Sequence, residues 1–514
     1  MWLILMALLE GCFTAYLLCL VPWRYVRWSL FGLLSLWSLV EVGTIVTTGE
    51  PITFTSVLLM TETNPSEAVG FFRQYFSIKA VMALLAAAVV VALCAVAITR
   101  ALHRLVFFIM MAVMAGAVDV ASLMGSLFTS DISELLVWEG QSDLLRQSLT
   151  RSERVRLCSP LPKLVFIGKS MWFERGVMEQ WERTQREAAV DDIVACGDRG
   201  YNLIVIIGES FIRSHSQLYG YGLPTNPGLM RERDAGRLVV FDDAWTSANF
   251  TTMSIRNMLN LNDTSADEQW YSGVYFPYLL RQGGWRVYHF DNQTASTSSD
   301  VGISRMIYSD FNMANTYCGV SDSLFEFDGD FADYVRSLIP DSTDSGGIVA
   351  FYHLMGQHFA ASDRFPGNGQ FTSDDITVER PWLDDKRRQE IADYDNATVY
   401  NDSVVCALLA PWADTPTLAL YFPDHGEDMW DLAPMEARNR PAYDDPAWVD
   451  RQFHIPFVAW MSDSFREEYP ALEQRLRAGS SNRVSLDNLG QLILGLTSLS
   501  TKYYIPARDP LAGI

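Results

Sequence analysis

The 514-residue sequence has little positive charge, and what it has is not clustered. It contains 39 lysines and arginines against 61 aspartates and glutamates, so its formal net charge at pH 7 is −22. No lysine- or arginine-rich block interrupts this acidic excess. Because a protein that binds nucleic acid needs a basic surface for the phosphate backbone, no nucleic-acid partner is expected.

Cysteine is also scarce. No two of the seven cysteines are spaced as Cys-x-x-Cys, which argues against a zinc site made of cysteines. Three lie in apolar stretches, where they act as ordinary apolar side chains: Cys12, Cys19 and Cys94. The other four allow three disulfide pairings, among which the sequence does not choose: Cys158, Cys196, Cys318 and Cys406.

Long apolar runs are confined to the first 130 residues or so. Four are long enough to cross a bilayer, which takes about 20 residues each: Trp2–Trp23, Ser29–Gly49, Ala80–Thr99 and Leu105–Phe128. Basic residues lie between the first and second runs and between the third and fourth, so the positive-inside rule places both short loops in the cytoplasm. Everything after the fourth run is then expected on the outer side, which is the periplasm in a Gram-negative cell.

Three regions are expected along the chain. Residues 1–129 are predicted to form a transmembrane domain of about four helices, and residues 130–199 a membrane-proximal helical linker. In residues 200–514, short apolar strands alternate with helical stretches, which indicates an α/β domain with a mostly parallel sheet and helices on both faces. The expected strands are Leu203–Ile207, Leu238–Phe241, Arg286–Phe290, Ile348–His353, Thr417–Phe422 and Phe457–Trp460.

Two of these strands end in side chains that bind metals. Glu209 follows the first strand after a glycine, and Asp424 and His425 follow the strand Thr417–Phe422. The carboxyl ends of parallel strands meet at one edge of a sheet, so these side chains are expected to lie together. A carboxylate and an imidazole side by side suit a divalent metal. The alternative is that Asp-His simply caps a helix.

A third strand leads into the segment His-Leu-Met-Gly-Gln-His, residues 353–358. Two histidines five positions apart do not share one face of a helix, so the chain is expected to turn after the strand. His358 is then free to bind a metal, while His353 orients the site or the substrate. Either histidine, taken by itself, is more often an ordinary hydrogen-bonded polar residue.

The segment 249–254 opens an expected helix, Ile255–Leu261, and contains two adjacent threonines. A hydroxyl at a helix N-terminus lies where free N–H groups and the helix dipole favour an anion. Metal binding lowers the pKa of such a hydroxyl and makes it a usable nucleophile. Ordinary capping by Thr251 or Thr252 is the alternative.

Together these motifs resemble the bacterial phosphoethanolamine transferases, membrane-anchored enzymes of the alkaline phosphatase and sulfatase superfamily. The matching segments occur in the family's order at residues 206–227, 353–358, 363–366, 394–397, 422–427 and 455–460. The resemblance implies an alkaline phosphatase-like fold for the α/β domain, which would be a periplasmic, sulfatase-like catalytic domain carried by a multi-pass protein of the bacterial inner membrane.

The resemblance also implies roles for particular residues. One tightly bound Zn²⁺ would be held by Glu209, Asp424, His425 and the nucleophilic threonine. That threonine is placed at Thr251, because the family pattern has a serine three residues later, and Thr252 is the fallback. A second Zn²⁺, or the phosphate itself, would be bound by two histidines that also serve as general acid or base: His358 and His454.

Four further residues are expected near the substrate. Asn292 and Gln293 follow the strand that ends at Phe290, and are expected to hydrogen-bond the ethanolamine or phosphate group. His353 is expected to bind substrate as well. His215 would line the pocket, with a purely structural role as an equal alternative.

The implied reaction is a two-step transfer. Thr251 attacks the phosphorus of phosphatidylethanolamine, diacylglycerol leaves, and the phosphothreonine intermediate passes phosphoethanolamine to an envelope glycan or lipopolysaccharide acceptor. Phosphoglycerol transfer, or phospho- or sulfo-hydrolysis within the same superfamily, is the alternative, although the nucleophile segment lacks the Cys/Ser-x-Pro-x-Arg motif of sulfatases. A non-catalytic membrane scaffold is disfavoured because the expected ligands are all present.

Overall fold

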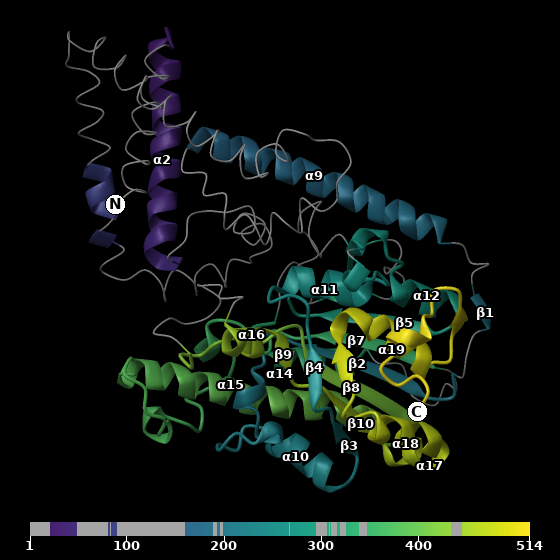
Figure 1. The fold of residues 1–514 in the computed structure, drawn as a ribbon. Helices are drawn as coiled ribbons and strands as arrows, with labels where there is room; N and C mark the ends of the chain where they lie inside the picture. The colour runs from purple at the N-terminus through teal and green to yellow at the C-terminus, as the bar shows by residue number, and fades with distance from the viewer. Residues whose placement is uncertain are drawn as a thin grey trace. The chain divides into compact units, whose positions relative to one another are not determined.

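The computed structural model describes residues 21–48, 81–82, 84–89, 160–188, 193–195, 199–266, 268–293, 306–307, 309, 316–318, 325–338, 347–432 and 445–514 (Figure 1). The chain divides into two compact units. One comprises Met1–Thr63 and Phe71–Glu174, and the other comprises Asn64–Gly70 and Arg175–Ile514.

In the first unit, the longest described element is the helix α2, Arg24–Thr48. The predicted span Ser29–Gly49 falls on it. Among the described residues, no helix has both the length and the apolar character that a bilayer crossing requires. The other three predicted spans lie wholly or largely outside the described residues. The helix α9, Pro160–Glu187, continues into the second unit.

The second unit is built on a seven-stranded sheet with the order β3-β10-β8-β2-β7-β5-β6. Its strands are β2 (Asn202–Gly208), β3 (Leu238–Val240), β5 (Arg286–Asp291), β6 (Thr316–Cys318), β7 (Ile348–His353), β8 (Thr417–Pro423) and β10 (Val458–Met461). β2, β5, β6, β7 and β8 pair in parallel, while β10 runs antiparallel to both of its neighbours. All six predicted strands are therefore confirmed, and the sheet is mostly parallel.

Two smaller sheets accompany the large one. The first has the order β11-β4-β9, formed by Arg483–Ser485, Asp243–Trp245 and His454–Ile455. The second pairs β1, Ile193–Ala195, with β12, Ser500–Thr501. These short strands are not among the six predicted from the sequence.

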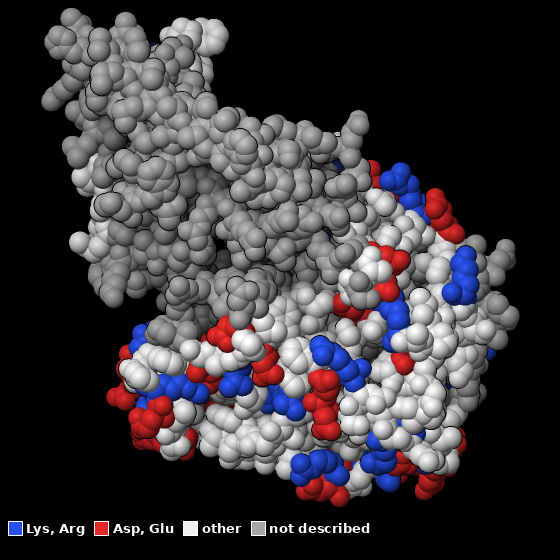
Figure 2. All heavy atoms as spheres, in the orientation of Figure 1, with Lys and Arg blue, Asp and Glu red and all other residues white. Residues whose placement is uncertain are grey.

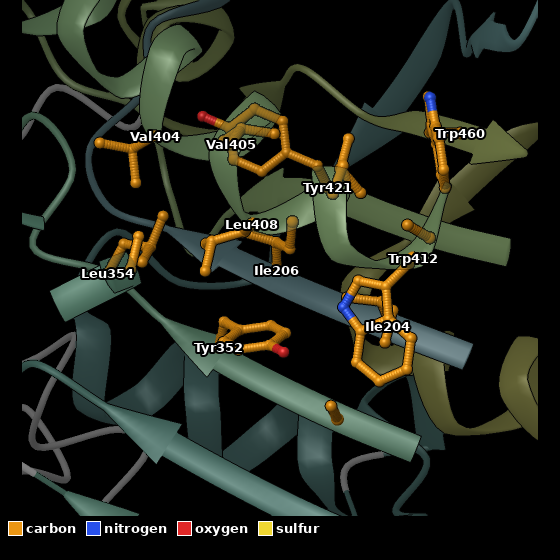
Figure 3. Close-up of a cluster of buried hydrophobic side chains, with 14 of the residues drawn as sticks. Ile204, Ile206, Tyr352, Leu354, Val404, Val405, Leu408, Trp412, Tyr421 and Trp460 are labelled. Carbon is orange, nitrogen blue, oxygen red and sulfur yellow. The ribbon is translucent and has the colours of Figure 1, made fainter. Parts of the chain in front are cut away.

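Helices cover both faces of the large sheet, as predicted. On one face, side chains of β2 and β7 pack against α10 (Pro227–Asp234), α14 (Asp328–Arg336) and α15 (Asp385–Leu409). Figure 3 shows Ile204 and Ile206 of β2 close to Leu408 and Trp412 of α15 and its 3-10 extension. Each such strand is an uninterrupted apolar run because parallel strands are buried on both faces.

The opposite face carries α11 (Thr251–Leu259), α12 (Phe276–Gln282) and α19 (Leu489–Leu496) (Figure 1). There the ring of Phe276 lies 6.0 Å from that of Phe351 of β7. The remaining described helices of this unit are α16 (Pro446–Phe453), α17 (Asp463–Glu468) and α18 (Pro470–Ala478).

On the face shown in Figure 2, acidic and basic side chains lie next to one another. Arg466 and Arg477, both partly exposed, each form an ion pair with Glu473. Ion pairs at the protein surface contribute little to stability. The charged groups that can bind a ligand strongly are therefore expected among the buried side chains.

The register of the central strands brings four carboxyl ends into line. Asp291 of β5 pairs with His353 of β7, His353 lies beside Ile207 of β2, and Gly208 pairs with Pro423 of β8. Any side chain one residue beyond these strands therefore lies at a single edge of the sheet.

Candidate metal centre

Three buried side chains meet at this edge. Glu209, Asp424 and His425 each present one ligand atom, and these atoms lie within 4.8 Å of one another. The Nε2 atom of His425 is 3.3 Å from Glu209 Oε1 and 3.2 Å from Asp424 Oδ2. Among the described residues, this is the one group of three or more potential ligands with such spacing.

The turn after β2 holds the two carboxylates in place. Asp424 N donates to the carbonyl of Gly208 (3.1 Å), which continues the pairing of β8 with β2. Ser210 donates from its N–H to Asp424 Oδ1 (3.3 Å) and from its hydroxyl to Glu209 Oε1 (2.6 Å). One serine thus contacts both acidic ligands, although a serine after Glu209 looks, in the sequence, like an ordinary turn or capping residue.

The imidazole of His425 is oriented by its own backbone. Its Nδ1 atom lies 2.8 Å from the carbonyl of Gly426, so the ring donates there and leaves the lone pair on Nε2 facing the two carboxylates. A hydrogen bond from the second ring nitrogen to a carbonyl is the usual arrangement behind a metal-bound histidine.

Thr251 is the first residue of α11, and its hydroxyl donates to Glu209 Oε2 at 2.9 Å. The next residue, Thr252, is buried, whereas Thr251 is partly exposed. Ser254 anchors the same helical turn by donating from its hydroxyl to the carbonyl of Asp424 at 2.7 Å. The geometry therefore favours Thr251 over Thr252 as the threonine of the site.

The side chains present fit zinc. Two carboxylates, one imidazole and a hydroxyl form the mixed oxygen and nitrogen donor set that Zn²⁺ accepts. Glu209 and Asp424 are fully buried, and a divalent cation would offset the desolvation of their charges.

Of the two residues after β5, one reaches the site and one does not. Gln293 donates from its amide to Glu209 Oε2 (3.0 Å) and to the carbonyl of Leu354 (2.7 Å). Asn292 instead donates to Asp328 Oδ1 (2.9 Å) and accepts from the N–H of Phe325 (2.8 Å). Its amide is committed to these structural contacts, so the substrate-binding role predicted for Asn292 is not supported.

The segment after β7 packs against Glu209. Gln357 N donates to the carbonyl of Glu209 at 3.1 Å, and Asp328 accepts from the N–H groups of Met355 (3.0 Å) and Gly356 (2.8 Å). Nδ1 of His358 lies 2.9 Å from the carbonyl of Phe359. His358 therefore lies on a loop that is attached to the site, although it does not join the cluster of three.

His353 is buried at the end of β7, with Nδ1 3.3 Å from Asp291 Oδ2. Burial lowers the pKa of His353, but the carboxylates of Asp291, Glu209 and Asp328 together outweigh burial, and the pKa ends above its ordinary value. Nε2 of His353 has no hydrogen-bond partner among the described residues.

His215 lies between two carboxylates. It is buried, with Nδ1 2.8 Å from Asp395 and Nε2 3.2 Å from Asp431. Burial would lower the pKa of His215, but the carboxylates of Asp431 and Asp395 raise it to about 10. Both ring nitrogens are engaged by carboxylates, which favours the structural alternative for His215.

His454 lies apart from the three ligands. It belongs to β9 in the small sheet, stacks on Trp245 at 4.5 Å, and directs Nδ1 to Asp450 (2.8 Å) and Nε2 to the carbonyl of Asp242 (3.3 Å). Both ring nitrogens are occupied, so this geometry does not support the metal-binding and catalytic roles predicted for His454.

Comparisons with known proteins agree with this fold. Residues 201–499 match the family model described as Sulfatase. Phosphoethanolamine transferase EptC of Escherichia coli K12 is 26% identical over 321 residues, which are 61% of this chain and 53% of EptC. The chain thus spans about half the length of the curated relatives it matches.

Two solved structures are similar in fold. The C-terminal periplasmic domain of E. coli EptC in complex with Zn superposes with a TM-score of 0.53 at 23% identity, over 62% of this chain and 88% of that domain. The integral membrane protein lipooligosaccharide phosphoethanolamine transferase A (EptA) of Neisseria meningitidis gives a TM-score of 0.64 at 16% identity, over 97% of this chain and 89% of EptA. With its match covering more than half of the 514 residues, the chain belongs to the sulfatase family.

Proposed function

We propose that this chain is a membrane-bound, zinc-dependent transferase that moves phosphoethanolamine from phosphatidylethanolamine to an envelope glycan or lipopolysaccharide acceptor. Residues 200–514 would form its periplasmic catalytic domain, carried by the bacterial inner membrane. The observation that carries the proposal is the hydrogen bond from the Thr251 hydroxyl to Glu209, inside the buried cluster with Asp424 and His425. The curated relatives are phosphoethanolamine transferases by name, and the related EptC domain binds Zn.

Thr251 is suited to act as the nucleophile. Its hydroxyl points to a buried carboxylate that orients it, and it opens a helix whose first N–H groups favour a phosphate. Zinc would be held by Glu209, Asp424, His425 and Thr251, where it would lower the pKa of the hydroxyl and offset negative charge on the phosphoryl group.

The reaction balances in two steps. In the first step Thr251 gives its hydroxyl proton to a general base and Oγ1 bonds to phosphorus, while the bond from phosphorus to the diacylglycerol oxygen breaks and that oxygen takes a proton from a general acid. In the second step an acceptor hydroxyl gives its proton to the base and its oxygen bonds to phosphorus, while the Thr251 oxygen leaves and takes up a proton. We assign the acid and base role to His358, whose loop is attached to Glu209 through Gln357.

Gln293 and His353 complete the proposed site. Gln293 holds Glu209 Oε2, the same oxygen that accepts from Thr251, so it helps to fix the direction of the nucleophile. His353 is buried at the sheet edge, and within the described part of the chain its Nε2 has no hydrogen-bond partner, so we assign it the role of donating to a phosphate oxygen.

The test is the intact mass of the full-length protein after incubation with phosphatidylethanolamine and zinc. The wild type is expected to gain one phosphoethanolamine on the Thr251 peptide, and Thr251→Ala to gain none. Thr252→Val is the matched control, since it removes the neighbouring hydroxyl while keeping the side-chain volume, and it is expected to retain the adduct. An adduct on Thr251→Ala would contradict the nucleophile assignment. An adduct formed only from phosphatidylglycerol would make the protein a phosphoglycerol transferase.

A further inference from the structure

The backbone at Ser210 is in an unfavourable conformation. Its φ is +55°, in the left-handed region that side chains other than glycine rarely adopt. Such a residue persists only where the surrounding structure determines it, and such positions cluster at functional sites. Other groups must therefore hold the backbone of Ser210 in this conformation.

The side chain of Tyr394, on α15, hydrogen-bonds to this turn. Its hydroxyl donates to the carbonyl of Ser210 at 2.6 Å and accepts from the N–H of Ile212 at 2.8 Å. Tyr394 is buried, and burial raises its pKa well above the ordinary value, so the hydroxyl keeps the proton that it donates. One side chain thus fixes the peptide groups on both sides of Phe211.

The turn is connected directly to the proposed zinc ligands. The N–H of Ser210 donates to Asp424 Oδ1, and the hydroxyl of Ser210 donates to Glu209 Oε1. The N–H and the hydroxyl of Ser210 are related to the carbonyl that Tyr394 holds through the φ, ψ and χ1 angles of Ser210, so the Tyr394 hydroxyl constrains the direction of both donors. A change at Tyr394 is therefore transmitted to both carboxylates through Ser210.

The next residue of the helix clamps the same loop further along. Asp395 accepts from His215 and from the hydroxyl of Tyr221 (2.7 Å). α15 therefore holds the loop after β2 at several points, and Tyr394 provides the one nearest to Glu209.

We propose that Tyr394 is a positioning residue for the metal site: its hydroxyl holds the Ser210 turn in the conformation that directs the carboxylates of Glu209 and Asp424 towards the metal. This inference rests on the zinc site of the proposed function, and it adds a residue that acts through the turn and touches neither substrate nor metal.

The experiment compares two tyrosine-to-phenylalanine substitutions in the full-length chain. Tyr394→Phe removes the hydroxyl and keeps the ring. Tyr201→Phe is the matched control, because Tyr201 is also buried and its hydroxyl also donates to a carbonyl, that of Leu496 at 2.9 Å, next to the amino end of β2. The zinc dissociation constant is measured by competition with a chromophoric chelator, and the Tm is measured on the zinc-free proteins.

The expected result separates positioning from general stability. Tyr394→Phe raises the zinc dissociation constant by about 10- to 100-fold, the usual loss when a group behind a metal ligand is removed. Tyr201→Phe lowers the Tm of the zinc-free protein but leaves zinc affinity within about twofold of wild type. Zinc affinity within twofold of wild type in Tyr394→Phe would overturn the inference. Absence of zinc binding in the wild type would overturn the proposed function as well.

A second comparison tests whether Tyr394 acts through the Ser210 turn. Glycine adopts positive φ without strain and lacks the hydroxyl that donates to Glu209, so a Ser210→Gly background removes the connection from Tyr394 through Ser210 to Glu209. Tyr394→Phe is then expected to cost less zinc affinity in the Ser210→Gly protein than in the wild type. An equal loss in both backgrounds would show that Tyr394 does not act through this turn.

Discussion

Gly356 is the position where one added methyl group should disturb the site most directly. Its φ is +49°, and a Cβ placed there would lie 2.7 Å from the N atom and 2.9 Å from the O atom of Glu209. These contacts are with backbone, so neither can be relieved by rotating a side chain. Gly356→Ala therefore forces the 354–358 loop away from Glu209 or moves Glu209 itself.

The magnitude has two parts. A left-handed conformation costs a non-glycine residue about 1–2 kcal/mol, and forcing an extra carbon into a filled space costs about 1–3 kcal/mol. Gly356→Ala should therefore lower the free energy of unfolding by about 2–5 kcal/mol. Since Glu209 is a proposed ligand, zinc affinity should fall as well.

Gly367 provides the control. Its φ is +79°, and a Cβ there would have nothing within 4 Å, so Gly367→Ala carries only the conformational cost. Urea unfolding of both variants and of wild type gives the two free energies, and chelator competition gives zinc affinity. Equal destabilisation by the two substitutions, with unchanged zinc binding, would refute the close contact between Gly356 and Glu209.

Three further outcomes are expected. With zinc at one hundred times its dissociation constant, the free energy of unfolding of wild type should be about 2.7 kcal/mol higher than after zinc is removed with a chelator. Glu209→Gln should abolish that difference. A difference that persists in Glu209→Gln would argue against Glu209 as a ligand. Wild type should unfold at a higher urea concentration than His215→Gln. This difference in urea midpoint should be full below pH 6.5 and decline as the pH rises towards about 10, because the pKa of His215 is raised in the folded state. A difference that grows with pH would contradict the pairing of His215 with the two carboxylates. Asp328→Ala should cost about 3 kcal/mol, since it leaves buried N–H groups of the 355–356 loop without their acceptor, and a loss under about 1 kcal/mol in calorimetry would show that the loop does not depend on this carboxylate.

The large sheet was predictable because its central strands are buried on both faces. β2, β7 and β8 are uninterrupted apolar runs, and each ends in polar residues at the point where the strand reaches the sheet edge. The same pattern predicts that Glu209, Asp424 and His425 lie together, and in the structure their ligand atoms lie within 4.8 Å of one another. The strands of two or three residues in the small sheets are too short for any periodicity to show.

The roles of single polar residues were less predictable. His215 and Asn292 find their partners on segments far away in sequence, Asp395 for His215 and Asp328 for Asn292, and His454 finds one of its two partners, the carbonyl of Asp242, on such a segment. A sequence shows that a histidine or an amide is present, but not whether a distant carboxylate already occupies it. Ser210 and Tyr394 were overlooked for the same reason, because hydroxyl groups that position a ligand look locally like any others.

The pairing of β2 with β8 has a consequence for how the protein folds. Ser210 and Asp424, which hydrogen-bond across this pair, are 214 residues apart in the chain. Contacts of such long range form late, since a large loop must close before they are gained. A metal held at the ends of these two strands therefore meets its complete ligand set only in the nearly native chain. We expect zinc to slow unfolding and to leave the folding rate almost unchanged, so that it increases the kinetic stability of the folded domain.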